Sequence, residues 1–307
     1  MYLLRKKIIL SNFDFLIFSG SWVFFLAGYL SGTPLYRIYY GSQFNAVLEK
    51  YLPNQQIKLI DQILNIVGNL YIYLINLFYA SFSKKNIAIS NFAANEFRKL
   101  YKFHFSEPIY LGSTRFVHQR RNRTSRNSVN LLSVSRLTPY KGFHFLINCL
   151  KKIKSNKQIK ITIVGSQPKL KYVNYLNEIG GNIVKIIINP SDNQLAAVYQ
   201  NTDIYLTADR YLYFGMPVLE AAEFAIPTIA LNSAAASEII RYGQTGYVAN
   251  NESEFIKYLT ELIEKNSFRK KMGLSAKKWA QKFTWEICAK KWENILFTSM
   301  NSREPKK

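Results

Sequence analysis

From residue 128 to residue 282, two kinds of apolar spacing alternate along the chain. Short continuous apolar runs predict strands, and apolar residues three or four positions apart predict helices. The predicted strands are Val129–Val134, Ile159–Val164, Ile183–Ile188, Ile204–Ala208, Pro227–Leu231 and a short one within Gly243–Val248. The predicted helices are Lys141–Lys154, Leu170–Ile179, one capped by Ser191 or Asp192 that runs through Tyr199, one from Met216, one carrying Glu238, Glu252–Lys265, Ser267–Lys282 and Trp285–Phe297. This alternation predicts an α/β protein with a doubly wound parallel sheet, whose ligands bind at the carboxyl ends of the strands.

The pattern is less regular before residue 128. The elements predicted there are a strand Phe13–Phe18, a helix through Tyr29, a strand Tyr36–Tyr40, a helix Ile57–Ser81, a short strand Ile87–Ser90 and a helix Asn91–Tyr101. The apolar runs Phe13–Leu30 and Ile63–Phe82 also resemble short membrane spans, but Asp14 and several Asn residues interrupt them. No small-x-small site follows the first run, so we expect no cleaved signal peptide. Both runs are equally compatible with buried elements or with a helix that has one face on lipid.

The segment from Asp203 to Glu238 carries the clearest candidate chemistry. A strand runs into the Phe214-Gly215 turn, a helix begins at Met216, and Glu220 follows one turn later. The first amides of a helix lack partners and the helix dipole favours negative charge there, so this arrangement can bind an anion. A carboxylate just behind such a site suits a ribose hydroxyl pair. The alternative is an ordinary βαβα unit in which the glycine only relieves a turn.

Charge and composition narrow the class of protein. The chain has 307 residues, 48% of them hydrophobic, enough for two domains with full cores. Its net charge is +22, and no acidic residue occurs between Glu107 and Glu178, an interval with 14 Lys or Arg. Such a field concentrates anions: a nucleotide-sugar diphosphate, an anionic membrane face, a lipid-linked pyrophosphate or nucleic acid. A solvated basic surface is the alternative.

The cysteines and histidines do not predict a metal site. Cys149 and Cys288 lie inside apolar helical patterns, which favours small core residues over a disulfide or a nucleophile. The three histidines, His104, His118 and His144, lack the spacing of metal ligands. We therefore expect no metal and no cofactor.

Six ordered blocks resemble the motifs of a known family. They are Val134–Leu137 with Lys141-Gly142, Ile163–Gly165, Tyr199–Asp203, Phe214–Ala221, Glu238–Ile240 with Gly243–Tyr247, and Phe283–Trp285. In order and spacing they resemble the retaining GT-B glycosyltransferases of family 4, the glycosyl transferases group 1. The resemblance covers about residues 128–298.

The resemblance implies a fold of GT-B type, with two Rossmann-like doubly wound parallel-sheet domains that face a cleft. Residues 1–127 would form a shortened acceptor-side domain that ends in the basic linker Arg115–Asn127. Residues 128–282 would bind the nucleotide-sugar. Residues 283–307 would form a helix that packs back toward the N-terminal domain.

The resemblance also assigns catalytic roles to two cations. Arg136 and Lys141 would hold the donor diphosphate and stabilise its charge as the sugar leaves, so the reaction requires no metal. The alternative is that both are solvated surface cations.

Further residues would bind the donor. Phe214, Gly215 and Met216 would bring backbone amides to the sugar-phosphate, and Glu220 would accept hydrogen bonds from the ribose. Gly165 would allow close approach near the nucleotide, unless it is a plain turn glycine. Asp209 would contact the donor sugar or cap a turn.

The chain departs from the family pattern at three places. Leu212 stands where the family has the first of two glutamates, eight positions before Glu220. Ala234-Ala235 replaces Gly-Gly before the Glu238 block, and Tyr40-Gly41 stands where the family often has His-Gly. The first strand of the N-terminal domain also has no counterpart, so we expect a divergent enzyme, a partner subunit, a truncated reading frame or a non-catalytic relative.

The leading hypothesis is a hexosyltransferase that moves a sugar from a nucleotide-diphosphate donor to a glycan or lipid-linked acceptor. We expect it in the cytoplasm, docked peripherally on an anionic membrane face. The second hypothesis is a non-catalytic nucleotide-sugar-binding or regulatory relative, for which Leu212 is the evidence. Nucleic-acid binding would rest on charge alone and has no accompanying motif, so we do not expect it.

Overall fold

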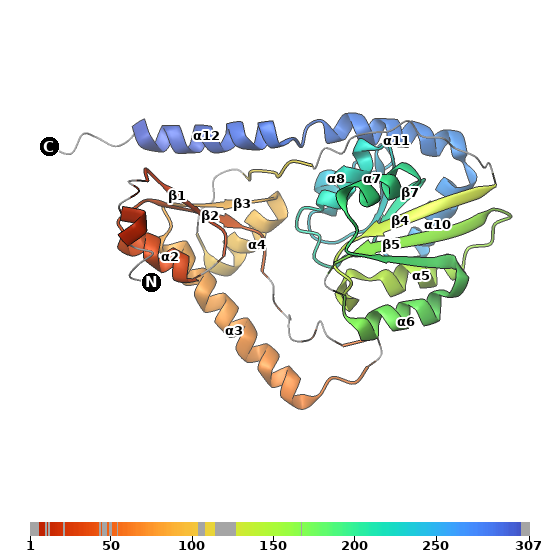
Figure 1. The fold of residues 1–307 in the computed structure, drawn as a ribbon, viewed down its shortest axis with the longest axis horizontal. Helices are drawn as coiled ribbons and strands as arrows, with labels where there is room; N and C mark the ends of the chain where they lie inside the picture. The colour runs from red at the N-terminus through yellow and green to blue at the C-terminus, as the bar shows by residue number, and fades with distance from the viewer. Residues whose placement is uncertain are drawn as a thin grey trace. The chain divides into compact units, whose positions relative to one another are not determined.

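The protein is described by a computed structural model that covers residues 6–301 except 10, 12, 21, 43, 45–47, 49–50, 54, 104–107, 114–126 and 167. The chain forms two compact units (Figure 1). The first comprises Met1–Leu48 and Ile57–Tyr110, and the second comprises Glu49–Gln56 and Leu111–Lys307. Most of the predicted linker, together with His104 and His118, lies outside the described residues.

The first unit contains a parallel three-stranded sheet in the order β1-β2-β3. Its elements are β1 (Leu16–Phe18), α2 (Trp22–Leu30), β2 (Leu35–Tyr39), α3 (Leu59–Phe82), β3 (Lys85–Ala88) and α4 (Asn91–Tyr101). They occur in the predicted order, with boundaries that differ by a few residues. Phe18, Phe25, Leu35 and Tyr79 form a small core, in which the ring centroids of Phe18 and Tyr79 are 4.9 Å apart.

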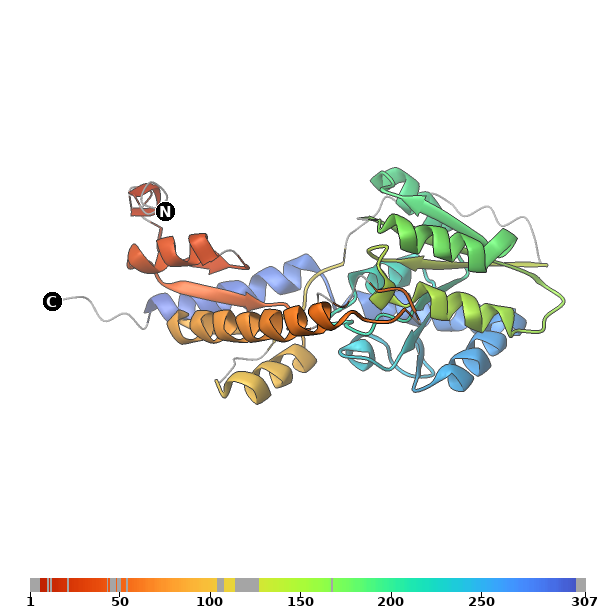
Figure 2. The same cartoon turned by 90° about the horizontal axis from the view of Figure 1, so that it is seen from below.

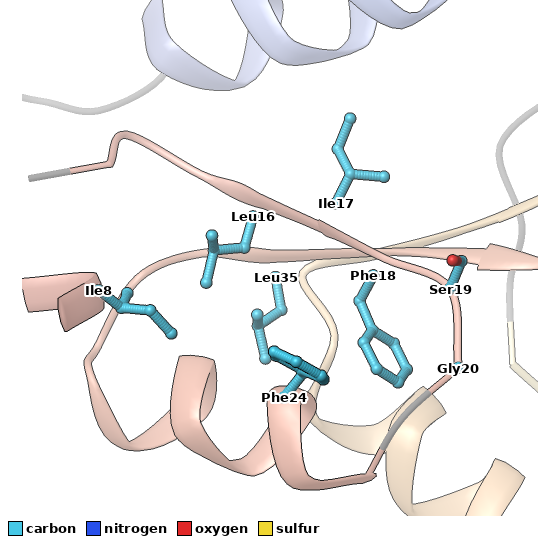
Figure 3. A pocket seen from close by; sticks show the side chains of 8 residues that line it. All are labelled: Ile8, Leu16, Ile17, Phe18, Ser19, Gly20, Phe24 and Leu35. Carbon is cyan, nitrogen blue, oxygen red and sulfur yellow. The ribbon is translucent and has the colours of Figure 1, made fainter. Parts of the chain in front are cut away.

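An apolar hollow of about 430 Å³ lies beside this sheet. Leu16, Phe18 and Leu35 point from β1 and β2 to the side on which Phe24 of α2 lies, and Ile17 points to the other side (Figure 3). This alternation follows from the two-residue period of a strand. Among the described residues that line this hollow, Ser19 has the one polar side chain. The hollow therefore lacks the charged groups that a nucleotide-sugar needs.

The N-terminal half of helix α3 buries polar residues and exposes apolar ones, whereas its C-terminal end buries Tyr79 and Ala80. Asp61 and Asn65 are 6% exposed, although a soluble helix normally buries its apolar stripe. The exposed apolar residues are Leu59, Ile60, Ile63, Leu64, Ile66, Val67, Leu70, Tyr71, Leu74, Phe78 and Phe82. By length and composition α3 could also cross a bilayer. A contiguous apolar face of this size on a protein surface indicates an interaction site.

The second unit contains a parallel six-stranded sheet in the order β6-β5-β4-β7-β8-β9, with helices on both faces (Figure 2). The strands are β4 (Ser128–Val134), β5 (Gln158–Gly165), β6 (Val184–Ile188), β7 (Ile204–Thr207), β8 (Thr228–Leu231) and β9 (Gly246–Ala249). The α-helices are α5 (Phe143–Lys151), α6 (Leu170–Gly180), α7 (Asp192–Gln200), α8 (Met216–Glu223), α9 (Ala236–Ile239), α10 (Glu252–Glu264), α11 (Asn266–Ala280) and α12 (Trp285–Asn301). The prediction of a doubly wound parallel sheet is confirmed.

The strand order places a topological switch between β4 and β7. The chain proceeds from β4 through β5 to β6, returns to β7 on the other side of β4, and continues to β8 and β9. The loops after β4 and β7 therefore leave the sheet in opposite directions, and in open α/β sheets ligands usually bind in the crevice at this point. Arg136 and Lys141 follow β4, and Asp209 follows β7.

One boundary differs from its prediction in a way that affects this crevice. Lys141 is the last residue of a 3-10 turn, η2 (Pro139–Lys141), and α5 begins only at Phe143. Gly142, with a φ of 73°, separates the two, a conformation that favours glycine. A Cβ at Gly142 would lie 2.6 Å from the carbonyl oxygen of Ala208, so only glycine lets this turn pack against the end of β7.

Candidate functional site

Lys141 and Asp209 form an ion pair across the switch-point crevice. Lys141 Nζ lies 2.5 Å from Asp209 Oδ2, and the two side chains are 11% and 8% exposed. An ion pair with so little contact with water is screened less than a surface pair. The pair thus joins the loop after β4 to the loop after β7 and sets the position of the Lys141 ammonium.

Asp209 also organises its own loop. Its Oδ1 accepts a hydrogen bond from the Tyr211 amide at 2.9 Å, which is a turn cap. Its carbonyl oxygen accepts from the Ser233 hydroxyl, so the loop after β8 is fastened to the loop after β7. Of the two predicted roles of Asp209, the turn cap is therefore observed, and the ion pair with Lys141 is an additional contact.

Arg136 and Lys141 lie on the same side of this crevice. The Arg136 guanidinium donates a hydrogen bond to the Tyr140 hydroxyl and lies 5.5 Å from the centroid of its ring. Lys141 Nζ lies 4.7 Å from the same centroid. Arg136 is exposed, whereas Lys141 is largely buried. Tyr140 therefore contacts both cations, and two positive charges beside one ring attract anions.

Gly165 is required by packing inside the unit. It is the last residue of β5, and a Cβ there would lie 2.0 Å from the carbonyl oxygen of Ser135. Any larger residue would push the loop that carries Arg136 away from the sheet. This contact is sufficient to explain the glycine without a nucleotide.

Helix α8 begins at the predicted turn. Gly215, with a φ of 86°, precedes Met216 at the start of the helix, and Pro217 follows, as is common in a first helical turn. Among the described residues no hydrogen-bond acceptor is found for the N–H groups of Gly215 and Met216. Phe214 is 3% exposed, so its ring is a packing residue and only its backbone is placed to meet a ligand.

Leu212 is part of the support beneath this turn. It is 7% exposed, and its carbonyl oxygen accepts from the Ala235 amide at 2.9 Å. Its side chain approaches Gly215, where a Cβ would lie 3.1 Å from Leu212 Cδ1. The neighbouring Ala234 has a φ of 47°, which is strained for any residue with a Cβ. The backbone at Ala234 thus keeps a conformation that favours glycine, although alanine stands there in place of the family's glycine.

Glu220 is held by a buried tyrosine. The Tyr199 hydroxyl donates to Glu220 Oε2 at 2.8 Å, and the two residues are 0% and 8% exposed. Burial, followed by the nearby carboxylate, raises the pKa of Tyr199 well above its ordinary value, so Tyr199 stays protonated and donates. The Tyr199 ring stacks on the Phe224 ring, with the two ring centroids 5.4 Å apart. This packing fixes the direction of the Tyr199 hydroxyl.

A second buried tyrosine lies at the carboxyl end of β4. Tyr205 on β7 donates to the Val134 carbonyl oxygen at 3.1 Å, at the carboxyl end of β4. Burial raises its pKa, and the charges of Glu220 and Asp209 raise it further. The described residues bring Lys141, Asp209 and Glu220 to the same end of the sheet.

The flank of α5 adds a polar hollow of about 500 Å³ next to Gly142 and Ala208. His144 lines it, and its Nδ1 lies 2.9 Å from the Tyr172 hydroxyl. Burial, with a smaller contribution from Arg210, lowers the pKa of His144 to about 4. His144 is therefore neutral at physiological pH and acts as a packing and hydrogen-bonding residue. Within the described part of the chain, no three His, Cys, Asp or Glu side chains gather as metal ligands.

The sequence predicts roles for Arg136, Lys141 and Glu220, and these roles stay predictions. It predicts no role for Tyr140, Tyr199 or Tyr205, which the structure places in contact with Arg136, Glu220 and the Val134 backbone, respectively. A signal was available for Tyr199, because it opens the block that resembles the family. The ion pair of Lys141 with Asp209, 68 residues away, had no local signal.

Comparison with known proteins places these residues in a family context. The sequence model of the family described as "Glycosyl transferases group 1" matches residues 115–279, just over half of the chain. A curated relative, the probable sucrose-phosphate synthase of Thermosipho melanesiensis, is 25% identical over 170 residues, which are 53% of this chain and 40% of that protein. The chain thus matches less than half the length of that relative.

Solved structures share the architecture at low sequence identity. A sucrose-phosphate synthase from Thermosynechococcus elongatus superposes with a TM-score of 0.77 at 14% identity, covering 97% of this chain and 77% of that chain. The Anabaena protein HepE, solved in complex with UDP and glucose, superposes with a TM-score of 0.70 at 16% identity, covering 95% and 80%. At these identities the likeness establishes the fold alone.

Proposed function

The chain belongs to the glycosyl transferases group 1 and has a fold of GT-B type, and on this basis we propose that it is a retaining glycosyltransferase. It transfers a hexose-type sugar from a nucleotide-diphosphate donor to a glycan or lipid-linked acceptor. The observation that carries the proposal is the ion pair of Lys141 with Asp209 at the carboxyl ends of β4 and β7, with Glu220 in the helix α8 that follows β7. The HepE complex with UDP and glucose supports the donor class by analogy.

Each group at the site has a role in this chemistry. The donor diphosphate lies against Lys141 and Arg136 and against the amides of Gly215 and Met216 at the start of α8. Glu220, aimed by Tyr199, accepts hydrogen bonds from the ribose hydroxyls. Asp209 holds the Lys141 ammonium in place before the donor arrives.

The reaction proceeds by departure of the diphosphate. The bond between the anomeric carbon and the diphosphate oxygen breaks, and both electrons leave with the oxygen. Lys141 and Arg136 stabilise the charge that develops there. The acceptor hydroxyl attacks the same face of the sugar, and its proton passes to the departing diphosphate. The anomeric configuration is retained, and no metal ion is needed.

One observation favours a second candidate function. Leu212 is buried beneath the Gly215 turn and offers no group that could bind the hydroxyls of the donor sugar. A nucleotide-sugar-binding relative without turnover would keep Lys141 and Glu220 and tolerate this loss. Binding of donor without product, across all acceptor classes, would identify that function.

We also propose that the protein docks on an anionic bilayer through α3. A helix with an outward apolar face of this kind lies in the plane of a membrane interface, with its apolar side among the acyl chains. Lys58, Lys84 and Lys85 flank its ends, and the chain carries a net charge of +22. Each cation near an anionic surface contributes about 1 kcal/mol. The location that follows is the cytoplasmic membrane face, where lipid-linked acceptors are accessible.

The test of the proposed function is product analysis. Purified protein is incubated with a panel of nucleotide-sugars and with glycan and lipid-linked acceptors, and products are identified by mass spectrometry and the anomeric configuration by NMR. The proposal expects one donor class to yield a glycoside with retained configuration. Inverted configuration would reject the mechanism, and binding without turnover would favour the second candidate.

A further inference from the structure

Arg37 is a buried cation without a carboxylate partner. It lies in the middle of β2 and is 4% exposed. Among the described residues it forms no ion pair. Its guanidinium instead donates to the Asn76 carbonyl oxygen at 3.0 Å and to Asn76 Oδ1. Three aromatic rings surround it, those of Tyr39, Tyr79 and Phe97, with centroids 5.3 to 5.4 Å from Cζ.

This burial is energetically unusual. Charged groups in a protein interior are normally paired, because removing a charge from water is expensive unless a counter-charge compensates for it. Burial lowers the pKa of Arg37 to about 10, so the side chain remains a cation at neutral pH. The Arg37 guanidinium carries five N–H groups, and two of them donate to the backbone and side-chain oxygens of Asn76. Among the described residues, the other N–H groups have no hydrogen-bond acceptor.

Arg37 lines a hollow of about 330 Å³ at the carboxyl ends of β1 and β2. This is the edge at which parallel sheets bind ligands. The rest of the described lining is mainly apolar or aromatic: Phe18, Trp22, Ile38, Tyr39, Tyr40, Tyr71, Ile72, Ile75 and Tyr79. Trp22 and Tyr71 are also exposed, at 54% and 59%, so the hollow opens onto an apolar surface.

We propose that Arg37 binds the phosphoryl group of an amphiphilic ligand in this hollow, with the ligand's apolar part on the surrounding aromatic residues. A guanidinium matches phosphoryl oxygens with two parallel hydrogen bonds, and the bound anion supplies the missing counter-charge. Asn76 orients the guanidinium toward the hollow. If the proposed transferase function holds, this ligand is the acceptor, and the acceptor carries its phosphate next to an apolar chain.

The experiment measures binding by calorimetry on the full chain carrying both Arg136→Ala and Lys141→Ala, which removes both cations of the proposed donor site. The probes are dodecyl phosphate below its micelle concentration, inorganic phosphate as the head group alone, and dodecyl maltoside as a chain without phosphate. We expect dodecyl phosphate to bind, inorganic phosphate to bind more weakly, and dodecyl maltoside to bind weakest. Tight binding of inorganic phosphate alone would instead assign the site to a free anion.

Two substitutions test the role of Arg37. Arg37→Met should weaken dodecyl phosphate binding about tenfold or more, through loss of charge-assisted hydrogen bonds. Asn76→Asp gives the guanidinium an internal counter-charge, so it should raise the melting temperature of the ligand-free protein and weaken dodecyl phosphate binding. Arg98→Gln, at an exposed arginine of α4, is the matched control and should change neither quantity.

Because the readout is binding with the donor site disabled, it is independent of whether the protein transfers a sugar. Equal dodecyl phosphate affinity in the parent, Arg37→Met and Asn76→Asp proteins would overturn the inference and make Arg37 a structural residue. If Arg37→Met does not fold, the Asn76→Asp comparison decides alone.

Discussion

The ammonium nitrogen of Lys141 lies 2.5 Å from Asp209 Oδ2, so the catalytic cation proposed here is already paired in the ligand-free protein. The pair spans the two loops that diverge from β4 and β7. An anionic donor must therefore share Lys141 with Asp209. A fixed ammonium loses less entropy on binding than a mobile one, which offsets part of that competition.

Removing either cation should slow sugar transfer. We expect Arg136→Ala and Lys141→Ala to lower kcat about 100- to 1000-fold, as loss of one transition-state donor does, measured as release of nucleoside diphosphate. Lys152→Ala is the matched control, because Lys152 belongs to an exposed ion pair with Glu252 in the same unit. Unchanged kcat in both site variants would exclude these residues from the mechanism.

The Asp209→Asn substitution distinguishes two effects of Asp209 on donor binding. Asp209 positions the Lys141 ammonium, and its negative charge repels the donor diphosphate. The amide keeps an oxygen for the Tyr211 N–H but removes a negative charge beside Lys141. We expect nucleoside diphosphate to bind several-fold more tightly by calorimetry, since one unit charge near an anion site is worth about 1 kcal/mol in polar surroundings. Weaker binding would indicate instead that Asp209 contacts the donor or that its hold on Lys141 dominates.

Tyr199→Phe should affect stability and donor affinity together. The substitution leaves the buried Glu220 carboxylate without this hydroxyl donor, which costs about 1–3 kcal/mol in free energy of unfolding. Urea denaturation measures that loss, and nucleotide titration should give a weaker dissociation constant. Tyr175→Phe in α6, whose ring stacks on Tyr172, serves as the control. A stable Tyr199→Phe protein with unchanged affinity would mean that Tyr199 does not position Glu220.

Leu212→Glu tests how closely the sugar pocket keeps the family geometry. The new carboxylate would stand eight positions before Glu220, beneath the Gly215 turn. If the pocket retains that geometry, we expect faster transfer or a broader donor range in the nucleotide-sugar panel. Leu212→Gln gives the uncharged comparison. A folded Leu212→Glu protein with lower activity than the parent would indicate a remodelled pocket.

The neutral His144 predicts a pH dependence of stability. Its pKa is lowered from an ordinary value of 6.5 to about 4 in the folded protein. Between these values the unfolded chain binds a proton that the folded chain does not, so stability is full above about pH 6.5 and falls as the pH drops toward 4. His144→Gln should flatten the melting temperature across this window. Parallel curves for the two proteins would show that His144 contributes nothing to the slope.

Much of the second unit was predictable because its signals are local. Apolar runs and helical spacing predicted the strand and helix order, and of the two predicted caps of α7, Ser191 and Asp192, the structure shows Ser191. The sequence predicted that Arg136 and Lys141 follow one strand and Glu220 another, and the structure has them in that order after β4 and β7. The family blocks then supplied the roles.

The remaining features depend on contacts between distant residues. Lys141 with Asp209 and Tyr199 with Glu220 required the strand order, which periodicity does not give. Hydrophobic spacing in Ile57–Ser81 predicted a helix but not that Asp61 and Asn65 are buried in it. The sequence around Arg37 predicts only an apolar strand. A binding role for Arg37 is indicated only by its burial without a carboxylate partner among the described residues.

The most direct test of the central claim is a crystal structure with bound nucleoside diphosphate. The account predicts phosphate oxygens within hydrogen-bond distance of Lys141 and the amides of Gly215 and Met216, with the ribose hydroxyls on Glu220. A diphosphate bound elsewhere on the second unit, with the Lys141–Asp209 pair untouched by the ligand, would contradict it.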